Sequence, residues 1–260
     1  MTVSLHNKVV CITGASAGIG LACAREFAAH GSRLLLSARR VELVQTLARD
    51  LEREHGTRSH VFELDVMDRT AVDQAFSSLP AEWKEIEILV NNAGLSRGLD
   101  KLYEGKIRDW EEMIDTNIKG LLYVTRQILP GMVTRNQGHI INLGSISGHQ
   151  VYPGGNVYCA SKAAVNILSH AMRMDLIGTN VRVCSIEPGL VETEFSKVRF
   201  HGDSERAAKV YSDTRPLKAE DVAEVVAFCA MRPPHVDISE VTIMPTDQAS
   251  VYHIHRTPKQ

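Results

Sequence analysis

Short apolar runs alternate with longer amphipathic segments along most of the chain. The runs at residues 8–13, 33–37, 61–66 and 86–91 are rich in leucine and β-branched residues, and helical periodicity follows each of the first three. Strands that are buried on both faces give such continuous apolar runs, and their alternation with helices is typical of a parallel sheet. The pattern therefore predicts an α/β fold.

Three further runs, at residues 139–144, 181–189 and 241–244, bring the prediction to about seven strands. Helices are predicted over residues 21–30, 41–54, 68–79, 110–133 and 219–231, and in the segment that follows residue 153. Neither an internal repeat nor a low-complexity linker divides the chain. We expect a single domain over residues 1–260, built on a doubly wound parallel sheet with flanking helices.

Composition narrows the functional classes. The 260 residues are 44% hydrophobic and 23% charged with a net charge of -2, values typical of a soluble globular protein. This charge provides no basic surface for nucleic acid or an anionic membrane, so we expect neither as a partner. The five cysteines are scattered and form no Cys-x-x-Cys pair. Cysteines in this arrangement predict reduced core thiols. Because no leader or membrane-length apolar run is recognisable, we expect a cytoplasmic protein.

A glycine-rich turn follows the first predicted strand. Gly14, Gly18 and Gly20 stand between this strand and the first predicted helix. In such a context the first glycine permits a tight turn, the second lets backbone approach a pyrophosphate, and the third lets the helix pack on the sheet. The amino end of the helix then faces the anion, so the arrangement predicts a dinucleotide coenzyme.

Tyr158, Lys162 and Ser145 are the candidate reacting groups. The first two are four residues apart and share a face if the segment is helical, while Ser145 ends a predicted buried strand, where open α/β sheets bind ligands. An ammonium ~4 Å away in a partly desolvated site stabilises a phenolate by roughly 4 kcal/mol, which predicts a fall in the Tyr158 pKa from about 10 to about 7. Ser145 would donate to the carbonyl oxygen that Tyr158 protonates. The three groups predict carbonyl reduction or its reverse, although an exposed helix pair would give the same spacing.

The end of the second predicted strand bears on the choice of coenzyme. NAD favours a carboxylate here, which accepts from the adenosine ribose, whereas NADP needs a cation for its 2′-phosphate. Position 38 is alanine, and Arg39 offers a forked cation whose charge-assisted bonds are worth roughly 1.5–3 kcal/mol. Arg40 either joins it or begins the next helix and faces solvent. We predict NADP(H), with two solvated loop arginines as the alternative.

Three motifs resemble those of the short-chain dehydrogenase/reductase family. They are Thr13-Gly-x-x-x-Gly-Ile-Gly20, Asn91-Asn-Ala-Gly94 and Tyr158-x-x-x-Lys162, and the similarity covers essentially the whole chain. The resemblance implies a Rossmann fold that binds NAD or NADP across the carboxyl edge of its sheet, usually in a dimer or tetramer. It also implies that Asn117 holds a water beside the lysine for reprotonation of the tyrosine, and that Thr193 donates to the nicotinamide carboxamide.

The motifs and the resemblance together give the complete predicted site. The catalytic residues are Asn117, Ser145, Tyr158 and Lys162. The coenzyme-binding residues are Gly14, Ser16, Gly18, Ile19, Gly20, Arg39, Arg40, Asp65, Val66, Asn91, Ala93, Gly94, Tyr158, Lys162, Pro188, Gly189 and Thr193.

Several local strings are similar to the bacterial NADP-dependent 3-hydroxy acid dehydrogenase branch of this family. They are residues 79–83, 113–117, 154–158, 186–191, 193–196 and 198–200, whereas residues 149–151 depart from the branch. That branch oxidises serine, allo-threonine and 3-hydroxy acids or reduces the matching semialdehydes, is typically tetrameric, and has relatives that reduce sulfoacetaldehyde. The resemblance implies a small hydroxy acid or the matching aldehyde as substrate, and a homotetramer.

An acidic substrate requires a cation near the reacting groups. Residues 190–211 are polar and poorly periodic, which predicts a lid over the substrate. Arg199 on this lid is the first candidate, followed by Arg97 and His149.

Two other functions would retain parts of this pattern. A reductase of bulkier ketones, diketones or carrier-bound acyl groups would keep the catalytic residues but line the lid with apolar side chains, whereas this lid is rich in charge. A non-enzymatic NADP sensor would tolerate loss of Tyr158 or Lys162. His253 and His255 lack a recognisable third ligand, so we expect no metal site. Glu112 is interpreted as part of a solvated helix face.

Overall fold

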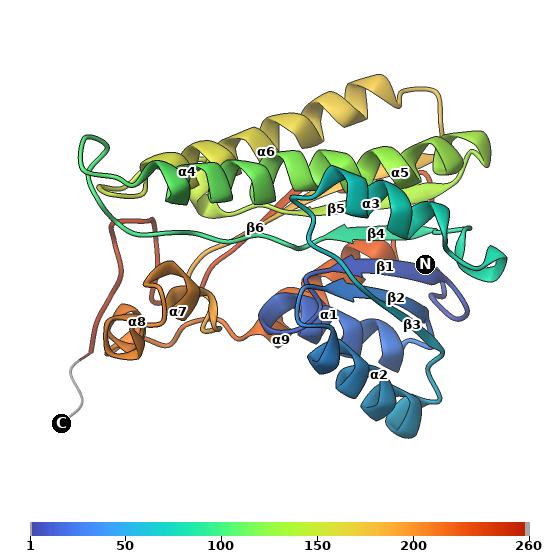
Figure 1. The fold of residues 1–260 in the computed structure, drawn as a ribbon, viewed down its shortest axis with the longest axis horizontal. Coiled ribbons are helices and arrows are strands. Elements are labelled where there is room, and N and C mark those ends of the chain that lie inside the picture. The colour runs from blue at the N-terminus through green and yellow to red at the C-terminus, as the bar shows by residue number, and fades with distance from the viewer. Residues whose placement is uncertain (1, 258–260) are drawn as a thin grey trace.

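One seven-stranded sheet runs through the protein (Figure 1). The structure, a computed structural model, describes residues 2–257. The strands are β1 (Val9–Thr13), β2 (Arg33–Ala38), β3 (Ser59–Glu63), β4 (Ile88–Asn91), β5 (Gly138–Leu143), β6 (Val181–Pro188) and β7 (Glu240–Ile243). Their order is β3-β2-β1-β4-β5-β6-β7, and every neighbouring pair is parallel. The predicted doubly wound parallel sheet is confirmed.

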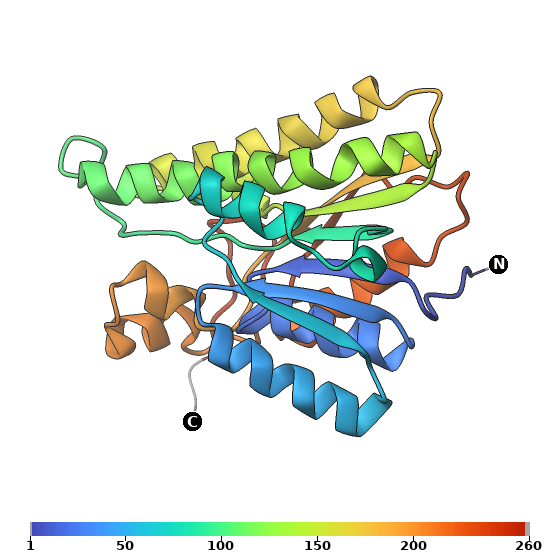
Figure 2. The same ribbon diagram turned by 45° about the vertical axis from the view of Figure 1, so that its right-hand side comes forward.

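Helices cover both faces of the sheet (Figures 1 and 2). α1 (Gly18–Ala29), α2 (Val41–His55) and α9 (Ala219–Ala230) pack on one face, and α3 (Arg69–Ser77), α5 (Leu121–Thr134) and α6 (Asn156–Asp175) pack on the other. Consecutive strand residues point to opposite faces, so Val10 belongs to one apolar cluster while Val9 and Cys11 belong to the second. Burial on both faces explains the continuous apolar runs in the sequence.

The third strand ends earlier than the sequence predicts. β3 ends at Glu63, and the chain then turns, with the backbone N–H of Met67 donating to the Asp65 carboxylate at 3.0 Å. Leu64 and Val66 remain buried beyond the strand. The apolar run therefore continues past the last strand residue because these side chains still enter the core.

The long helix predicted at residues 110–133 is divided. It begins as α4 (Ile107–Ile114), passes through a π-helical turn, η2 (Asp115–Gly120), and continues as α5. π turns occur frequently at functional sites. At Gly120 a Cβ atom would lie 2.6 Å from the Val66 side chain, so this glycine lets the helix lie close to the chain that follows β3.

The predicted lid is more regular than its sequence suggests. It contains two short helices, α7 (Phe195–Arg199) and α8 (Ser204–Tyr211), drawn in orange at the left of Figure 1. β1 and β4 lie at the centre of the sheet, and the strand order reverses between them. Open α/β sheets bind ligands at such a reversal, beyond the carboxyl ends of the strands.

The cysteines and the helices can also be compared with what the composition predicts. All five cysteines are buried and unpaired. None of the helices between residues 2 and 257 combines the length and the apolar character that a bilayer span needs.

Candidate active site

A cavity of about 620 Å³ lies between the carboxyl edge of the sheet and the lid. Its volume is typical of ligand sites. The structure brings most of the predicted site residues to it, namely Gly14, Ser16, Gly18, Ile19, Arg39, Arg40, Asp65, Val66, Ala93, Gly94, Arg97, Ser145, Tyr158, Lys162, Pro188, Gly189, Thr193 and Arg199. Four others, Gly20, Asn91, Asn117 and His149, lie outside its lining.

The glycine loop is shaped for close approach of a ligand. Gly14 and Gly18 have φ angles of 68° and 55°, a left-handed conformation that glycine adopts without strain. The N-cap of α1, Ala17, makes no side-chain hydrogen bond, so the N–H groups of the first turn can meet an anion. At Gly20 a Cβ atom would lie 2.4 Å from Nδ2 of Asn92. It would also lie 2.5 Å from the carbonyl oxygen of Gly14, so Gly20 lets α1 lie close to the chain that leaves β1 and β4.

Tyr158, Ser145 and Lys162 meet at one wall of the cavity. Tyr158 lies in the first turn of α6, is 7% exposed, and packs on the Phe195 ring of the lid with the centroids 5.5 Å apart. The Ser145 hydroxyl accepts from the backbone N–H of Ser147 at 3.1 Å. It also lies close enough to Tyr158 to lower the pKa of that phenol by hydrogen bonding.

Burial dominates the ionisation of Tyr158. Loss of water raises the pKa of Tyr158, and the charge of Arg199 is the largest influence in the opposite direction. Lys162 instead donates from Nζ to the carbonyl oxygen of Leu143 at 2.7 Å. Burial lowers the pKa of Lys162 to about 8, and the charge of Glu187 raises it. The prediction that Lys162 brings the Tyr158 pKa to about 7 is therefore wrong for this geometry.

Asn117 lies in the π turn and braces the cavity wall. Its Oδ1 accepts from the Leu95 N–H at 2.8 Å, and its Nδ2 donates to the Leu95 carbonyl oxygen at 2.8 Å and to the Ser161 hydroxyl at 2.9 Å. Both hydrogens of the side-chain amide are thus engaged. A Cβ atom on Gly94 would lie 3.3 Å from this Oδ1 and 3.5 Å from Lys162 Nζ. The N–H groups of the Asn117 side chain are therefore not available to hold the predicted water.

Arg199 extends from α7 over the reacting groups. Its guanidinium carbon is 5.2 Å from the ring centroid of Tyr158 and 5.0 Å from that of Phe195. Nε donates to the Ser96 hydroxyl and Nη2 to the Tyr152 hydroxyl, both at 3.0 Å. Among the described residues these bonds hold two of the three nitrogens and leave Nη1 for a ligand.

Arg97 is occupied by other protein groups. Nε and Nη2 donate to the two carboxylate oxygens of Glu112 at 2.7 Å, and Nη1 donates to the Val198 carbonyl oxygen at 2.6 Å. This pairing raises the pKa of Arg97 and lowers that of Glu112. The interpretation of Glu112 as a solvated residue is therefore wrong. Arg97 ties the lid to the chain that follows β4 instead of offering a free cation.

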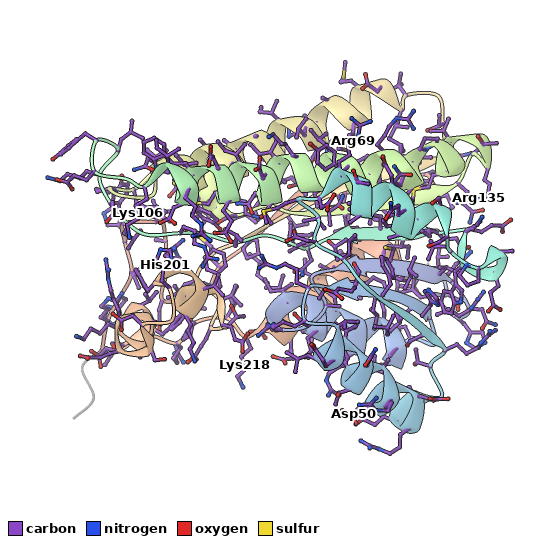
Figure 3. The ribbon with its side chains drawn as sticks, in the orientation of Figure 1. Asp50, Arg69, Lys106, Arg135, His201 and Lys218 are labelled. Carbon is purple, nitrogen blue, oxygen red and sulfur yellow. The ribbon has the colours of Figure 1, made fainter. Side chains whose placement is uncertain are left out.

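Two further contacts hold the lid in place. The backbone N–H of Gly98 donates to the carbonyl oxygen of Arg199 at 2.9 Å. His201, which follows α7, places Nε2 3.1 Å from the Asp109 carboxylate on α4. His201 and Lys106, the residue before α4, are labelled at the same end of the molecule in Figure 3. The lid is thus joined to α4 and to the chain that precedes it.

Arg39 and Arg40 lie beside the glycine loop. Arg39 is 53% exposed, and its Nη1 lies 3.9 Å from the Asp65 carboxylate. Arg40 donates from Nη2 to Glu194 on the lid at 2.9 Å and to the Ser16 hydroxyl at 3.4 Å. Arg40 therefore connects the loop to the lid and does not simply face solvent.

A model of the short chain dehydrogenase family matches residues 8–204 of the chain. The chain belongs to this family. It is 49% identical over 251 residues to the NADP-dependent 3-hydroxy acid dehydrogenase YdfG of Salmonella typhi, a match that covers 96% of this chain and 100% of that protein. An NADP-dependent 3-hydroxy acid dehydrogenase of Schizosaccharomyces pombe is 42% identical, over 97% of this chain and 98% of that protein. The solved closed form of serine dehydrogenase complexed with NADP+ is 48% identical, with a TM-score of 0.89 over 96% of this chain and 100% of that one.

The two adjacent asparagines of this short-chain dehydrogenase have different partners. Asn91 donates to the Asn142 side chain at 2.9 Å, and so joins β4 to β5 in the core. Asn92 donates from Nδ2 to the carbonyl oxygens of Thr13 at 2.9 Å and Gly14 at 3.1 Å. Asn92 therefore holds the glycine loop. No local pattern distinguishes two identical neighbours whose contacts are both with distant segments.

The prediction for His149 is wrong, and Glu187 was missed by the sequence analysis. His149 lies outside the cavity lining, with Nε2 3.2 Å from both Glu240 and Asn166, so it is not placed to meet a substrate. Glu187 is fully buried beside the backbone of Ser145, whose N–H donates to its carboxylate. An acid inside an apolar strand was the available signal for Glu187.

Proposed function

We propose that this short-chain dehydrogenase is an NADP-dependent oxidoreductase that transfers hydride between NADP(H) and a small hydroxy acid or the matching aldehyde or keto compound. The meeting of Tyr158, Ser145 and Lys162 at one cavity wall carries the proposal. Nearly full-length similarity to NADP-dependent 3-hydroxy acid dehydrogenases and to serine dehydrogenase supports the substrate class.

The residues at the carboxyl edge fit a phosphorylated dinucleotide. The left-handed Gly14 and Gly18 and the uncapped first turn of α1 would hold the pyrophosphate, and Arg39 with Arg40 would hold the 2′-phosphate. A Cβ atom on Gly18 would lie 3.3 Å from the Thr193 side chain, so a larger residue at position 18 would crowd the lid. The coenzyme supplies hydride in reduction and accepts it in oxidation.

In reduction, Tyr158 gives its phenolic proton to the substrate's carbonyl oxygen. Ser145 donates a hydrogen bond to the same oxygen and stabilises charge as it develops there. The cations Arg199 and Lys162 favour the tyrosinate that remains and oppose the effect of burial. Because the pKa of Lys162 is about 8, this support is fully present below that pH and is lost as the pH rises through it.

Replacing the phenol tests the mechanism. We expect Tyr158→Phe to lower kcat by about 100-fold or more, since a positioned general acid contributes 10²–10⁴-fold. The affinity for NADPH, measured by fluorescence titration, should stay within about twofold, because the substitution leaves the glycine loop intact. Tyr123→Phe on α5, outside the cavity, is the matched control and should retain wild-type turnover. A Tyr158→Phe enzyme with most of its activity would contradict the mechanism.

Removal of Arg39 tests the choice of coenzyme. Loss of a charge-assisted pair of about 1.5–3 kcal/mol should weaken NADPH binding roughly 10- to 100-fold in Arg39→Ala and leave NADH binding almost unchanged. Isothermal titration with both coenzymes measures this difference. Arg49→Ala on the exposed surface of α2 should bind both as the wild type does. Equal losses for NADPH and NADH would show that Arg39 does not read the 2′-phosphate.

Arg199 is the proposed partner for the acid group of the substrate. Its position over Tyr158 and its remaining nitrogen, Nη1, suit a carboxylate, and a sulfonate would meet the same cation. The contacts to Ser96 and Tyr152 hold the guanidinium in this orientation.

Substrates with and without an acid group test this partner. Arg199→Ala should raise KM for a 3-hydroxy acid roughly tenfold or more, as expected for loss of about 1.5–3 kcal/mol, while KM for a neutral alcohol of similar size changes little. Lys197→Ala on the same helix, an exposed cation, is the control. An unaltered KM for the acid would remove Arg199 from the substrate site.

We further propose a cytoplasmic homotetramer. Five unpaired, buried cysteines suit a reducing compartment. α5 and α6 carry exposed apolar side chains, among them Leu122, Ile167 (66% exposed) and Met174 (75%), and they lie next to each other in both views (Figures 1 and 2). Such a surface suits contact with further copies. Multi-angle light scattering should give four chains; a monomer at micromolar concentration would refute the assembly.

A further inference from the structure

Glu187 is a buried acid with no role in the mechanism described so far. It is 0% exposed near the end of β6, and its carboxylate accepts from the backbone N–H of Ser145 and from the Ser185 hydroxyl. A Cβ atom on Gly144 would lie 2.2 Å from either carboxylate oxygen. Glycine at position 144 therefore lets the acid reach directly beneath the residue that carries the catalytic hydroxyl.

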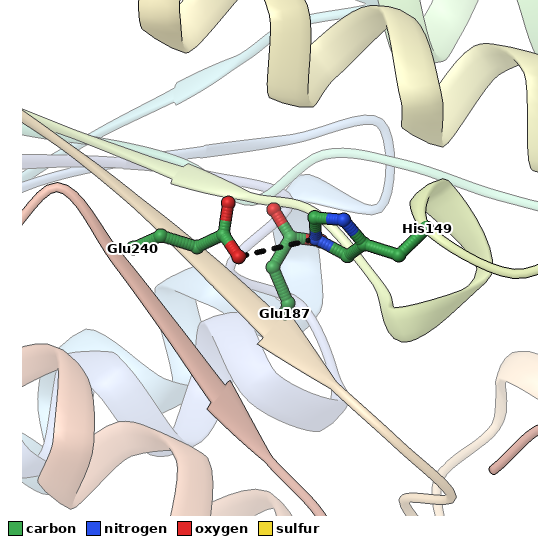
Figure 4. A group of neighbouring side chains, drawn as sticks. All are labelled: His149, Glu187 and Glu240. Atoms are coloured by element: carbon green, nitrogen blue, oxygen red, sulfur yellow. Dashed lines mark ion pairs between the residues drawn. The ribbon is translucent and has the colours of Figure 1, made fainter.

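The carboxylate of Glu187 lies beside His149 and Glu240 (Figure 4). Lys162 of α6 and His149, which follows β5, both stabilise its ionised form, and Glu240 of β7 lies 3.2 Å from the histidine. His170, also on α6, lies 3.8 Å from Glu240. Glu187 is therefore the acid in this group that contacts the backbone of Ser145.

The group also has the composition of a metal site, but its atoms already have partners. One ligand atom each from His149, Glu187 and Glu240 lie within 4.8 Å of one another. The side-chain amide of Asn166 donates to Glu240 at 2.7 Å and lies 3.2 Å from His149 Nε2. These contacts account for the arrangement as a hydrogen-bonded network of side chains.

We propose that Glu187 is a positioning residue for the reaction: it fixes the backbone of Ser145 from below, and its negative charge keeps Lys162 protonated. The inference rests on the proposed function, because it assigns Glu187 to the two groups that act on the carbonyl oxygen and the tyrosinate. Neither contact requires Glu187 to touch substrate or coenzyme.

The electrostatic part of this role has a definite sign. Burial lowers the pKa of Lys162 to about 8, and Glu187 is the group whose charge raises it. Without that charge the pKa of Lys162 falls further, so the lysine is neutral over more of the working range. Burial raises the pKa of Glu187 itself, whereas the Ser185 hydroxyl, the Ser145 N–H and Lys162 lower it.

The pH profile of reductive kcat in Glu187→Gln tests the proposal. The amide keeps the shape and removes the charge, so the alkaline limb should move to lower pH by about one unit, as expected for loss of one nearby opposite charge. At pH 8 this shift lowers the protonated fraction of Lys162 from about one half to about one tenth, so kcat should fall about fivefold. NADPH affinity and the thermal unfolding midpoint are measured in parallel. Asp237→Asn, which removes a carboxylate that accepts from the Val183 N–H of the same strand, is the control and should leave the profile unchanged.

Ser185→Ala provides a second route if Glu187→Gln does not fold. Losing the hydroxyl raises the pKa of Glu187, so the acid limb of the same profile should move to higher pH. Unshifted limbs in both single variants, with Tyr158→Phe inactive, would overturn the role of Glu187 and leave the proposed function standing. An active Tyr158→Phe enzyme would instead overturn the proposed function itself.

Discussion

A phenol that is buried away from water ionises less readily than one in solution. The charged groups of this candidate active site lie around such a phenol. Burial raises the pKa of Tyr158, although a general acid and base must release and regain its proton. The largest opposing influence on this pKa is the charge of Arg199, which belongs to α7. Because Arg199 belongs to the lid, the ionisation of Tyr158 depends on a residue of the lid.

Two neighbouring residues of the lid, Val198 and Arg199, make different contacts. The carbonyl oxygen of Val198 accepts from Arg97, which is in turn fixed by Glu112. The next residue, Arg199, then directs its guanidinium at the reacting groups. One ion pair thus serves as an anchor, and a second arginine remains available for charge stabilisation. The two arginines differ in their partners: Arg97 pairs with Glu112, whereas Arg199 donates to the hydroxyls of Ser96 and Tyr152.

Much of this molecule could be predicted from local patterns. Continuous apolar runs gave the strands, since both faces of the sheet are covered, and the spacing of Gly14, Gly18, Tyr158 and Lys162 gave the cavity. The misses all depend on contacts between distant segments. The engagement of Arg97, the division of labour between Asn91 and Asn92, and the desolvation of Tyr158 arise only when the chain is folded. A sequence pattern records which residue types are present, but not which of them exclude water from a given hydroxyl.

The π turn at Asp115–Gly120 has a consequence for how this fold tolerates change in length. Each residue of an α-helix advances the side chains by about 100°, and a π turn accommodates one extra residue. If one residue were deleted there, α4 and α5 could not both keep their present phase. Either Asn117 would rotate away from Leu95, or Val124 and its apolar neighbours would turn out of the core. The contacts of Asn117 and of Val124 therefore fix the relative register of α4 and α5. Natural variation in length should be confined to the loops on either side.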